Sequence, residues 1–300
     1  MFKKIQIFVL AVATFGNVNA QKTKINSGER PKLVVGLVVD QMRWDYLYRY
    51  ENKFGKGGFQ RLLGEGYSLN NVHIPYIPTV TAIGHTSIYT GSVPSIHGIA
   101  GNDWTDKATG KNVYCTADED MKPVGTDNKR SGSHSPKNLW STTMTDQLMI
   151  ASNFKSKVVG VSLKDRASIL PAGHNPTGAF WFDDSNGKFI TSSYYMNELP
   201  KWVNDFNNQK VPEKLLANGW QTALPISEYT ESTADNVTWE KPVGTAKDPV
   251  FPYNNLLTDY ATKKGVIRTT PFGNTLTLKF AESALDNYSL GKGSETDFLA

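Results

Sequence analysis

Two short runs of hydrophobic residues stand out from the polar sequence around them and predict buried strands. Residues 32–40 read KLVVGLVVD and residues 157–163 read KVVGVSL, and both runs are rich in β-branched side chains. Nearly continuous apolar runs of this length are typical of strands covered on both faces in a parallel sheet. Both runs lead into charged residues, Asp40 after the first and Lys164 and Arg166 after the second.

Apolar residues spaced three or four positions apart predict helices between and after these strands. The resulting alternation of strands and helices predicts an α/β fold with a mostly parallel central sheet flanked by helices. Residues 103–139 are polar and irregular and predict a long loop. The predicted helices cover residues 41–50, 82–90, 140–153 and 274–288, the last with one apolar stripe, and further strands are predicted over residues 67–77 and 295–300.

Residues 180–260 differ from the rest of the chain because aromatic residues are spread among prolines and polar turns. We interpret this segment as an inserted cap region that packs on the main sheet, within a domain that covers residues 21–300. The aromatic residues are Trp181, Tyr194, Tyr195, Trp202, Trp220, Tyr229, Trp239 and Tyr253.

The first twenty residues have the pattern of a secretory signal peptide. Lys3 and Lys4 precede an apolar run over residues 5–15, and the small residues of 18–20 suit cleavage after Ala20. The run is shorter than the roughly 20 apolar residues that a membrane helix needs, and no later stretch reaches that length. We therefore expect a periplasmic or secreted protein that is not held in a membrane after cleavage.

Composition predicts a globular protein without special cross-links. Hydrophobic residues make up 39% of the sequence and aromatic residues 11%, which suffices for a large core. Cys115 is the only cysteine, so the chain has no internal disulfide. The formal net charge is only +4 and includes Lys3 and Lys4, so we expect no nucleic-acid partner and no membrane-surface partner. The composition indicates no particular oligomeric state.

Glycines are frequent in residues 55–66, which read GKGGFQRLLGEG. The segment lacks the GK[ST] ending of a phosphate-binding P-loop. Its glycines bracket a short apolar helix, so turn and cap roles explain them better.

Residues 78–98, PTVTAIGHTSIYTGSVPSIHG, lead from a threonine-rich entry into a short helix. A hydroxyl at a helix N-terminus faces unpaired N–H groups and the positive end of the helix dipole, which favour an alkoxide and a phosphate. Thr81 is the candidate nucleophile, although Thr81 could instead cap the helix, a role for which Thr79 is also placed. Asp40, after a buried strand, is either a site residue or the cap of the next helix.

Three blocks of the sequence resemble the alkaline phosphatase superfamily in its threonine-nucleophile branch, which includes the type I phosphodiesterases and nucleotide pyrophosphatases. The blocks read VVDQMRWDYL, PTVTAIGHTSIYTGSVPSIHGIAGND and VVGVSLKDRASILPAGH and follow one another in the family's order. The similarity extends from Pro31 to the end of the chain. The exported, phosphate-irrepressible bacterial alkaline phosphatases, which are zinc phosphomonoesterases, are the most similar type.

The resemblance implies a role for each candidate residue. Thr81 matches the nucleophile and a zinc ligand, and Asp40 matches a zinc ligand. Asn102 matches an amide that donates to a nonbridging phosphate oxygen, although it could simply be a turn residue. Lys164 and Arg166 match side chains that contact the oxygens of a phosphate monoester dianion, although they could also form a solvated strand end.

The resemblance also implies the reaction and its cofactor. Two zinc ions roughly 4 Å apart would support in-line transfer of a phosphoryl group from a small phosphate ester to Thr81 and then to water. The family's remaining zinc ligands lie beyond Ala300, so we expect the N-terminal part of a longer enzyme that is inactive as it stands. The histidines present match no ligand position, and His85 and His97 are expected to serve packing or loop hydrogen bonds; the others are His73, His134 and His174.

Three alternatives stay open at this stage. A phosphodiesterase or nucleotide pyrophosphatase would use the same scaffold. A sulfatase fits less well, because that branch needs a Cys or Ser in a Pro- and Arg-containing motif, whereas Cys115 lies in YCTADED. An exported module that binds glycans or a partner through its aromatic segment is a third possibility.

Overall fold

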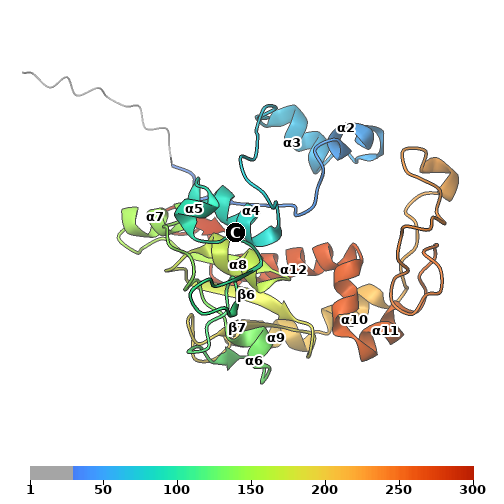
Figure 1. Cartoon of the computed structure of the whole chain (residues 1–300). Helices are drawn as coiled ribbons and strands as arrows, with labels where there is room; N and C mark the ends of the chain where they lie inside the picture. The colour runs from blue at the N-terminus through green and yellow to red at the C-terminus, as the bar shows by residue number, and fades with distance from the viewer. Residues whose placement is uncertain (1–29) are drawn as a thin grey trace, which may run out of the picture. The chain divides into compact units, whose positions relative to one another are not determined.

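The structure is a computed structural model that describes residues 30–300, of which 32–300 form one compact unit (Figure 1). The predicted signal peptide, residues 1–20, lies outside the described residues. None of the helices in the described part of the chain is long and apolar enough to cross a membrane.

A six-stranded mixed sheet forms the centre of this unit. Four neighbouring strands run parallel to one another, and the last two strands pair antiparallel. This arrangement confirms the predicted α/β fold with a mostly parallel sheet. The strands in order across the sheet are β1 (Leu33–Val35), β8 (Asp297–Leu299), β5 (Val158–Ser162), β6 (Gly178–Asp183), β7 (Lys188–Ser192) and β4 (Pro123–Val124).

Alternating side chains of β6 show how helices cover both faces of the sheet. Ala179 and Trp181 pack with apolar residues of α8 on one face. Phe180 and Phe182 belong to the larger core on the opposite face. The first face carries α4 (Thr81–Thr90), α7 (Met144–Ala151) and α8 (Asp165–Ala172), and the second carries α9 (Lys201–Asn208), α10 (Val211–Leu216), α11 (Leu256–Thr262) and α12 (Phe272–Asn287).

The long helix α12 anchors the larger core. Leu276, Phe280 and Ala284 are fully buried along one stripe, as the spacing predicted. The ring of Phe280 stacks on Phe189 of β7 with centroids 3.8 Å apart. Contacts of this kind stabilise the sheet beyond the burial of apolar area alone.

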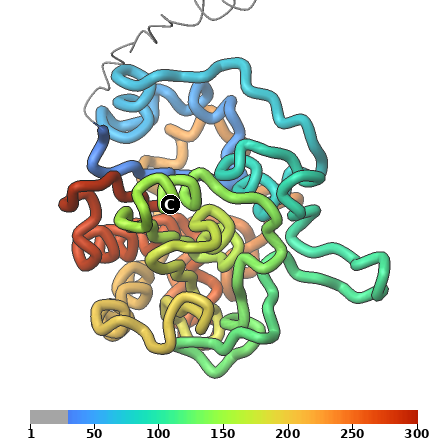
Figure 2. The backbone as a smooth tube through the Cα atoms, turned by 90° about the vertical axis from the view of Figure 1, so that its left-hand side faces the viewer, coloured from blue at the N-terminus to red at the C-terminus, as the bar shows by residue number. Residues whose placement is uncertain are grey.

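Shorter elements connect the two layers. A two-stranded hairpin, blue-green in Figure 2, extends from the chain between α5 and β4, so the predicted loop 103–139 holds some regular structure. The elements are α2 (Tyr46–Arg49), η1 (Glu51–Lys53), α3 (Phe59–Glu65), α5 (Pro94–His97), β2 (Asp103–Thr105), β3 (Asn112–Tyr114), α6 (Lys129–Gly132), η2 (Ile226–Glu228) and η3 (Lys264–Thr269).

The prediction of a buried strand over residues 32–40 was largely wrong. Only Leu33–Val35 form β1, which lies at the edge of the sheet and pairs with β8. The N–H of Gly36 still donates to the carbonyl oxygen of Leu299 in β8, but residues 37–40 form no strand, and Leu37 is 79% exposed. The predicted helix 41–50 shortens to α2, and residues 67–77 form no strand.

The start of the predicted insertion also needs correction. Residues 178–192 supply β6 and β7 of the central sheet, and Trp181 is buried there. Helices α9 and α10 pack in the same core as α12. The interpretation of the remaining residues, 193–260, as an insertion stays a prediction.

Candidate active site

Asp40 and Lys164 lie close together at the end of the sheet where the parallel strands terminate. They follow β1 and β5, the two parallel strands that flank β8. The carboxyl ends of parallel strands lie at the same end of the sheet, and ligand sites of open α/β sheets are usually found there. The Lys164 ammonium is 3.7 Å from Asp40 Oδ2, and both side chains are about one-third exposed. The sheet therefore brings together two residues that are far apart in the sequence.

Thr81 is the first residue of α4 and points at Asp40. Its Oγ1 donates a hydrogen bond to Asp40 Oδ2 at 2.8 Å, and Thr81 is only 8% exposed. The N-cap position is held by Val80, which has no side-chain oxygen to cap the helix. The cap role considered for Thr79 and Thr81 is therefore wrong, and the Thr81 hydroxyl is directed at Asp40 instead.

Asn102 supplies the missing helix cap. The backbone N–H of Ala82 donates to Asn102 Oδ1 at 3.0 Å. A side-chain oxygen at this position satisfies one of the unpaired N–H groups of the helix. Because the oxygen of Asn102 is engaged, its amide NH2 is the part that remains to donate to a ligand beside Thr81.

Lys164 and Arg166 lie at the start of α8 and do not continue β5. Lys164 is the N-cap residue with an extended backbone, and Arg166 is the second helical residue. The alternative of a strand end therefore does not describe them, because both belong to the start of the helix. Cations are unfavourable near the positive end of a helix dipole, and a bound anion would offset this repulsion.

Arg166 is held by residues that the sequence analysis missed. Its Nη1 donates to the Tyr114 hydroxyl at 2.7 Å, and that hydroxyl donates to Asp165 Oδ1 at 3.0 Å. Thr116 Oγ1 donates to the other oxygen of Asp165 at 2.5 Å. Asp165 could have been noticed as the neighbour of Arg166, whereas nothing in the sequence connects Tyr114 with residues some fifty positions later.

His85 lies beneath Thr81 on the same face of α4. Its Nδ1 donates to the carbonyl oxygen of Thr81 at 2.9 Å, since a carbonyl can only accept. Burial lowers the pKa of His85, although Asp40 and the Thr81 carbonyl act in the opposite direction. His97 likewise pairs with Ser87 and with the N–H of Ile99. Both histidines therefore serve local hydrogen bonds, as predicted.

Asp40 and Thr81 fit two ligands of a divalent cation. Their oxygens are 2.8 Å apart, close enough to contact one ion, and oxygen donors suit zinc. A structural or catalytic zinc site has about four ligands. Within residues 30–300, no group of three or more His, Cys, Asp or Glu side chains is arranged to hold a metal.

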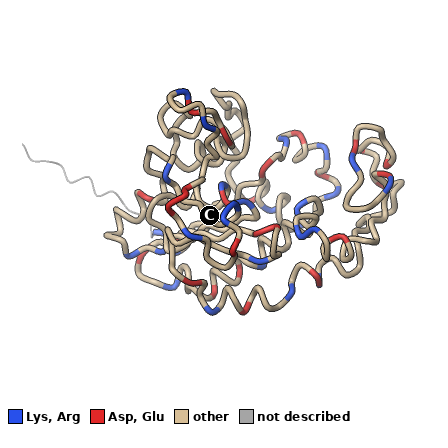
Figure 3. Tube along the Cα trace, turned by 60° about the horizontal axis from the view of Figure 1, so that its bottom comes forward, with Lys and Arg blue, Asp and Glu red and all other residues tan. Residues whose placement is uncertain are grey.

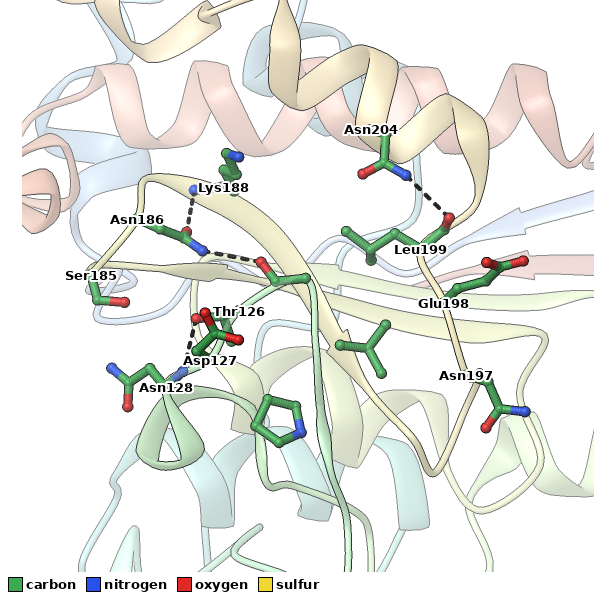
Figure 4. A pocket seen from close by; sticks show the side chains of 13 residues that line it. Thr126, Asp127, Asn128, Ser185, Asn186, Lys188, Asn197, Glu198, Leu199 and Asn204 are labelled. Carbon is green, nitrogen blue, oxygen red and sulfur yellow. Dashed lines mark hydrogen bonds between the residues drawn. The ribbon is translucent and has the colours of Figure 1, made fainter.

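One pocket lies elsewhere, beside the β4 edge of the sheet, and none of the five candidate residues lines it (Figure 4). It has a volume of about 890 Å³. Asn186 and Asn204 line it, but their amides donate to the carbonyl oxygens of Gly125 and Leu199 (Figure 4). These side chains stabilise turns, so the pocket carries no evident chemistry.

Charged residues of both signs are interspersed along the described chain (Figure 3). Neither sign of charge is confined to one part of the trace in that view. Lys164 is the positive group beside Asp40, and Arg166 follows it two residues later in α8.

A family model described as type I phosphodiesterase / nucleotide pyrophosphatase matches residues 34–287. The chain belongs to this family. The resemblance seen in the three sequence blocks is thereby confirmed, and the matched range contains all five candidate residues.

Two of the relatives are alkaline phosphatases by name. The chain is 69% identical over 297 residues to alkaline phosphatase PafA of Elizabethkingia meningoseptica, covering 99% of this chain and 54% of PafA. It is 50% identical over 306 residues to alkaline phosphatase PhoV of Synechococcus elongatus, covering 99% of this chain and 55% of PhoV. The chain spans about half the length of these relatives.

The fold agrees with a solved structure of the same family. The crystal structure of wild-type PafA superposes with a TM-score of 0.90 at 72% sequence identity. The match covers 91% of this chain and 53% of the PafA chain. The mixed sheet and its helices therefore match the corresponding part of the PafA fold.

Proposed function

We propose that the protein hydrolyses small phosphate monoesters through a covalent phosphothreonine on Thr81. The observation that carries this proposal is the Thr81 hydroxyl, nearly buried at the start of α4 and hydrogen-bonded to Asp40. Asn102 binds the N–H of the residue after Thr81, Lys164 lies 3.7 Å from Asp40, and Arg166 follows Lys164 in α8. The names of the relatives, both alkaline phosphatases, support the same activity.

The reaction has two in-line steps. The oxygen of Thr81 attacks phosphorus, a Thr81–phosphorus bond forms, and the bond to the ester oxygen breaks as the alcohol leaves with a proton. Water then attacks the same phosphorus, the bond to Thr81 breaks, and inorganic phosphate leaves. Such loose transition states depend on positioning and electrostatic stabilisation more than on covalent chemistry by the protein.

The residues of this chain hold the phosphoryl group in place. The amide of Asn102 donates to one nonbridging oxygen, since its oxygen is already bound by Ala82. Arg166 and Lys164 face the remaining negative oxygens from the start of α8. The dipole of α8 adds to this positive field.

Zinc is the proposed cofactor, with two ions in the complete site. Bound zinc would lower the pKa of the Thr81 hydroxyl and neutralise developing charge. Asp40 and Thr81 would supply two of the ligands. We propose that the protein is exported by its N-terminal segment.

The second candidate function is hydrolysis of diesters, which the name of the family favours. A diester carries an alkyl group where a monoester carries a further negative oxygen. The cations Lys164 and Arg166 have little use against an alkyl group, so their presence favours the monoester.

Replacement of the nucleophile tests the proposal. The protein in its natural length, loaded with zinc, should release a chromogenic alcohol from a phosphate monoester. Thr81→Ala should abolish this release, and acid quenching of the unchanged protein should trap phosphate on a peptide that contains Thr81. Turnover that persists in Thr81→Ala, or label on another peptide, contradicts the proposal.

A further inference from the structure

The guanidinium of Arg166 is fixed by a directed set of hydrogen bonds. Arg166 can only donate, so the Tyr114 oxygen must accept its Nη1–H at 2.7 Å. The phenol hydrogen is then directed to Asp165 Oδ1, 3.0 Å away. The Thr116 hydroxyl donates to Asp165 Oδ2 and holds the carboxylate from its other side. Nη1 of the arginine is thus linked through Tyr114 to a carboxylate that Thr116 also binds.

The charge states of these groups agree with that direction of donation. Burial, and next the charge of Asp165, raise the pKa of Tyr114, so the phenol stays neutral and keeps its hydrogen. Burial alone would lower the pKa of Arg166, but Tyr114 and Asp165 raise it above its ordinary value. The arginine therefore stays charged although it is partly buried.

The same segment is bonded to Asn102. The N–H of Cys115 donates to the carbonyl oxygen of Asn102 at 2.9 Å. Asn138 Nδ2 donates to the carbonyls of Tyr114 and Cys115 at 3.4 and 3.2 Å and holds the segment from behind. Residues 114–116 thus contact both groups proposed to bind the phosphoryl oxygens, Asn102 through the backbone and Arg166 through a side chain.

We propose that Tyr114 and Asp165 are positioning residues that aim Arg166 at the phosphoryl group, and that residues 114–116 set the distance between Arg166 and Asn102. This inference rests on the proposed function, because it concerns how the donors of that site are held. It gives the β2–β3 hairpin, whose last residue is Tyr114, a role in substrate recognition.

The test uses Tyr114→Phe in the zinc-loaded protein of natural length. The change removes one hydroxyl and leaves the ring in place. We expect kcat/KM for a phosphate monoester to fall by about tenfold to a hundredfold, since the free energy of a hydrogen bond to a charged group corresponds to a factor of this size. Turnover of a diester should change by less than about twofold, because a diester makes little use of Arg166. Inorganic phosphate should inhibit the variant more weakly.

Tyr195→Phe is the matched control. Tyr195 is also largely buried, but its hydroxyl has no hydrogen-bond partner among the described residues. Its loss should leave both activities unchanged. Asp165→Asn is the second variant, in which an amide oxygen can still accept from Tyr114, so a smaller loss of monoester turnover is expected.

A double-mutant cycle separates positioning from a general structural effect. In an Arg166→Ala background, Tyr114→Phe should cause no further loss of monoester turnover, because the group it positions is gone. A full additional loss there, or equal losses for monoester and diester, would overturn the inference. If Arg166→Ala itself leaves monoester turnover unchanged, the role proposed for Arg166 fails, which is a different outcome.

Discussion

The hydroxyl of Tyr89 donates a hydrogen bond to the carbonyl oxygen of Gly36 at 3.0 Å. Tyr89 belongs to α4, the helix that begins at Thr81, and Gly36 lies between β1 and Asp40. The bond therefore joins the segment that carries Asp40 to the helix that carries Thr81. It helps to hold Asp40 beside Thr81, the proposed nucleophile.

Removing the hydrogen bond between Tyr89 and Gly36 should weaken the attachment of α4 to the segment that follows β1. Burial raises the pKa of Tyr89 to about 12, so its hydroxyl keeps its hydrogen and donates over the ordinary pH range. Tyr89→Phe should lower the free energy of unfolding by about 1–2 kcal/mol, as expected when a hydrogen bond is lost and its acceptor is left without a partner. Urea denaturation measures this, with Tyr195→Phe as the control. Equal stabilities of the two variants would show that the bond contributes nothing.

Gly36→Ala tests the close approach at the same place. A Cβ at residue 36 would collide with the Tyr89 hydroxyl and lie about 3.0 Å from the ring of Phe298. Both neighbours are buried, so we expect a loss of about 1–3 kcal/mol in the free energy of unfolding, typical of overpacking. Gly57→Ala, where a Cβ meets nothing within 4 Å, is the control and should be nearly neutral.

Two substitutions of Asn102 should separate its two roles. Asn102→Asp keeps an oxygen for the N–H of Ala82 and suits the helix dipole, so stability should be retained. The new carboxylate should repel phosphate, so monoester turnover should fall by at least about tenfold. Asn102→Ala should lower both turnover and stability, the latter by about 1 kcal/mol. Thermal unfolding beside turnover assays measures both, and unchanged turnover in Asn102→Asp would contradict the role in phosphate binding.

Lys164 and Arg166 should matter more for monoesters than for diesters. The double variant Lys164→Ala, Arg166→Ala removes two positive charges beside the proposed phosphoryl site. We expect kcat/KM for monoesters to fall by at least about 100-fold and for diesters by about tenfold or less. The ratio of the two efficiencies is the measurement. If diester turnover falls as much as monoester turnover, the phosphodiesterase alternative gains support.

A partly buried ion pair between His174 and Asp146 should make stability depend on pH. His174 Nδ1 donates to Asp146 Oδ2 at 2.9 Å, and Nε2 donates to the Leu139 carbonyl at 2.9 Å, so the doubly protonated ring satisfies both acceptors. The hydrogen bond to Asp146 raises the pKa of His174 despite partial burial. Burial would raise the pKa of Asp146, but hydrogen bonds from His174 and the Thr143 N–H lower it.

Because the pKa of His174 is raised in the folded protein, the stability that its ion pair provides decreases as pH rises. The charged ring stabilises the fold fully below the ordinary histidine pKa, and this contribution is lost as pH rises through the higher folded value. His174→Gln should cost about 1–2 kcal/mol near pH 5 and less near pH 9. Chemical denaturation at several pH values measures the difference between the two proteins. A difference that does not shrink as pH rises would contradict this assignment.

The amino-acid pattern by itself determined the regular parts of this protein. The run of residues 158–162 gave a buried strand and the stripe of Leu276, Phe280 and Ala284 gave a helix, because burial in a packed core imposes these periods directly. The sequence blocks also identified the family. The apolar run of residues 36–40 did not form the predicted strand, because a strand needs a partner strand as well as β-branched side chains.

Only the tertiary structure decided how the candidate site is assembled. Asp40 approaches Lys164 because β1 and β5 terminate at the same end of the sheet, and Asn102 caps α4 because the chain returns to it after α5. Tyr114 reaches Arg166 from a hairpin some fifty residues away. These contacts join residues with no shared period or spacing, so no local pattern encodes them. They arise when packing of the sheet and its helices fixes where the connecting segments meet.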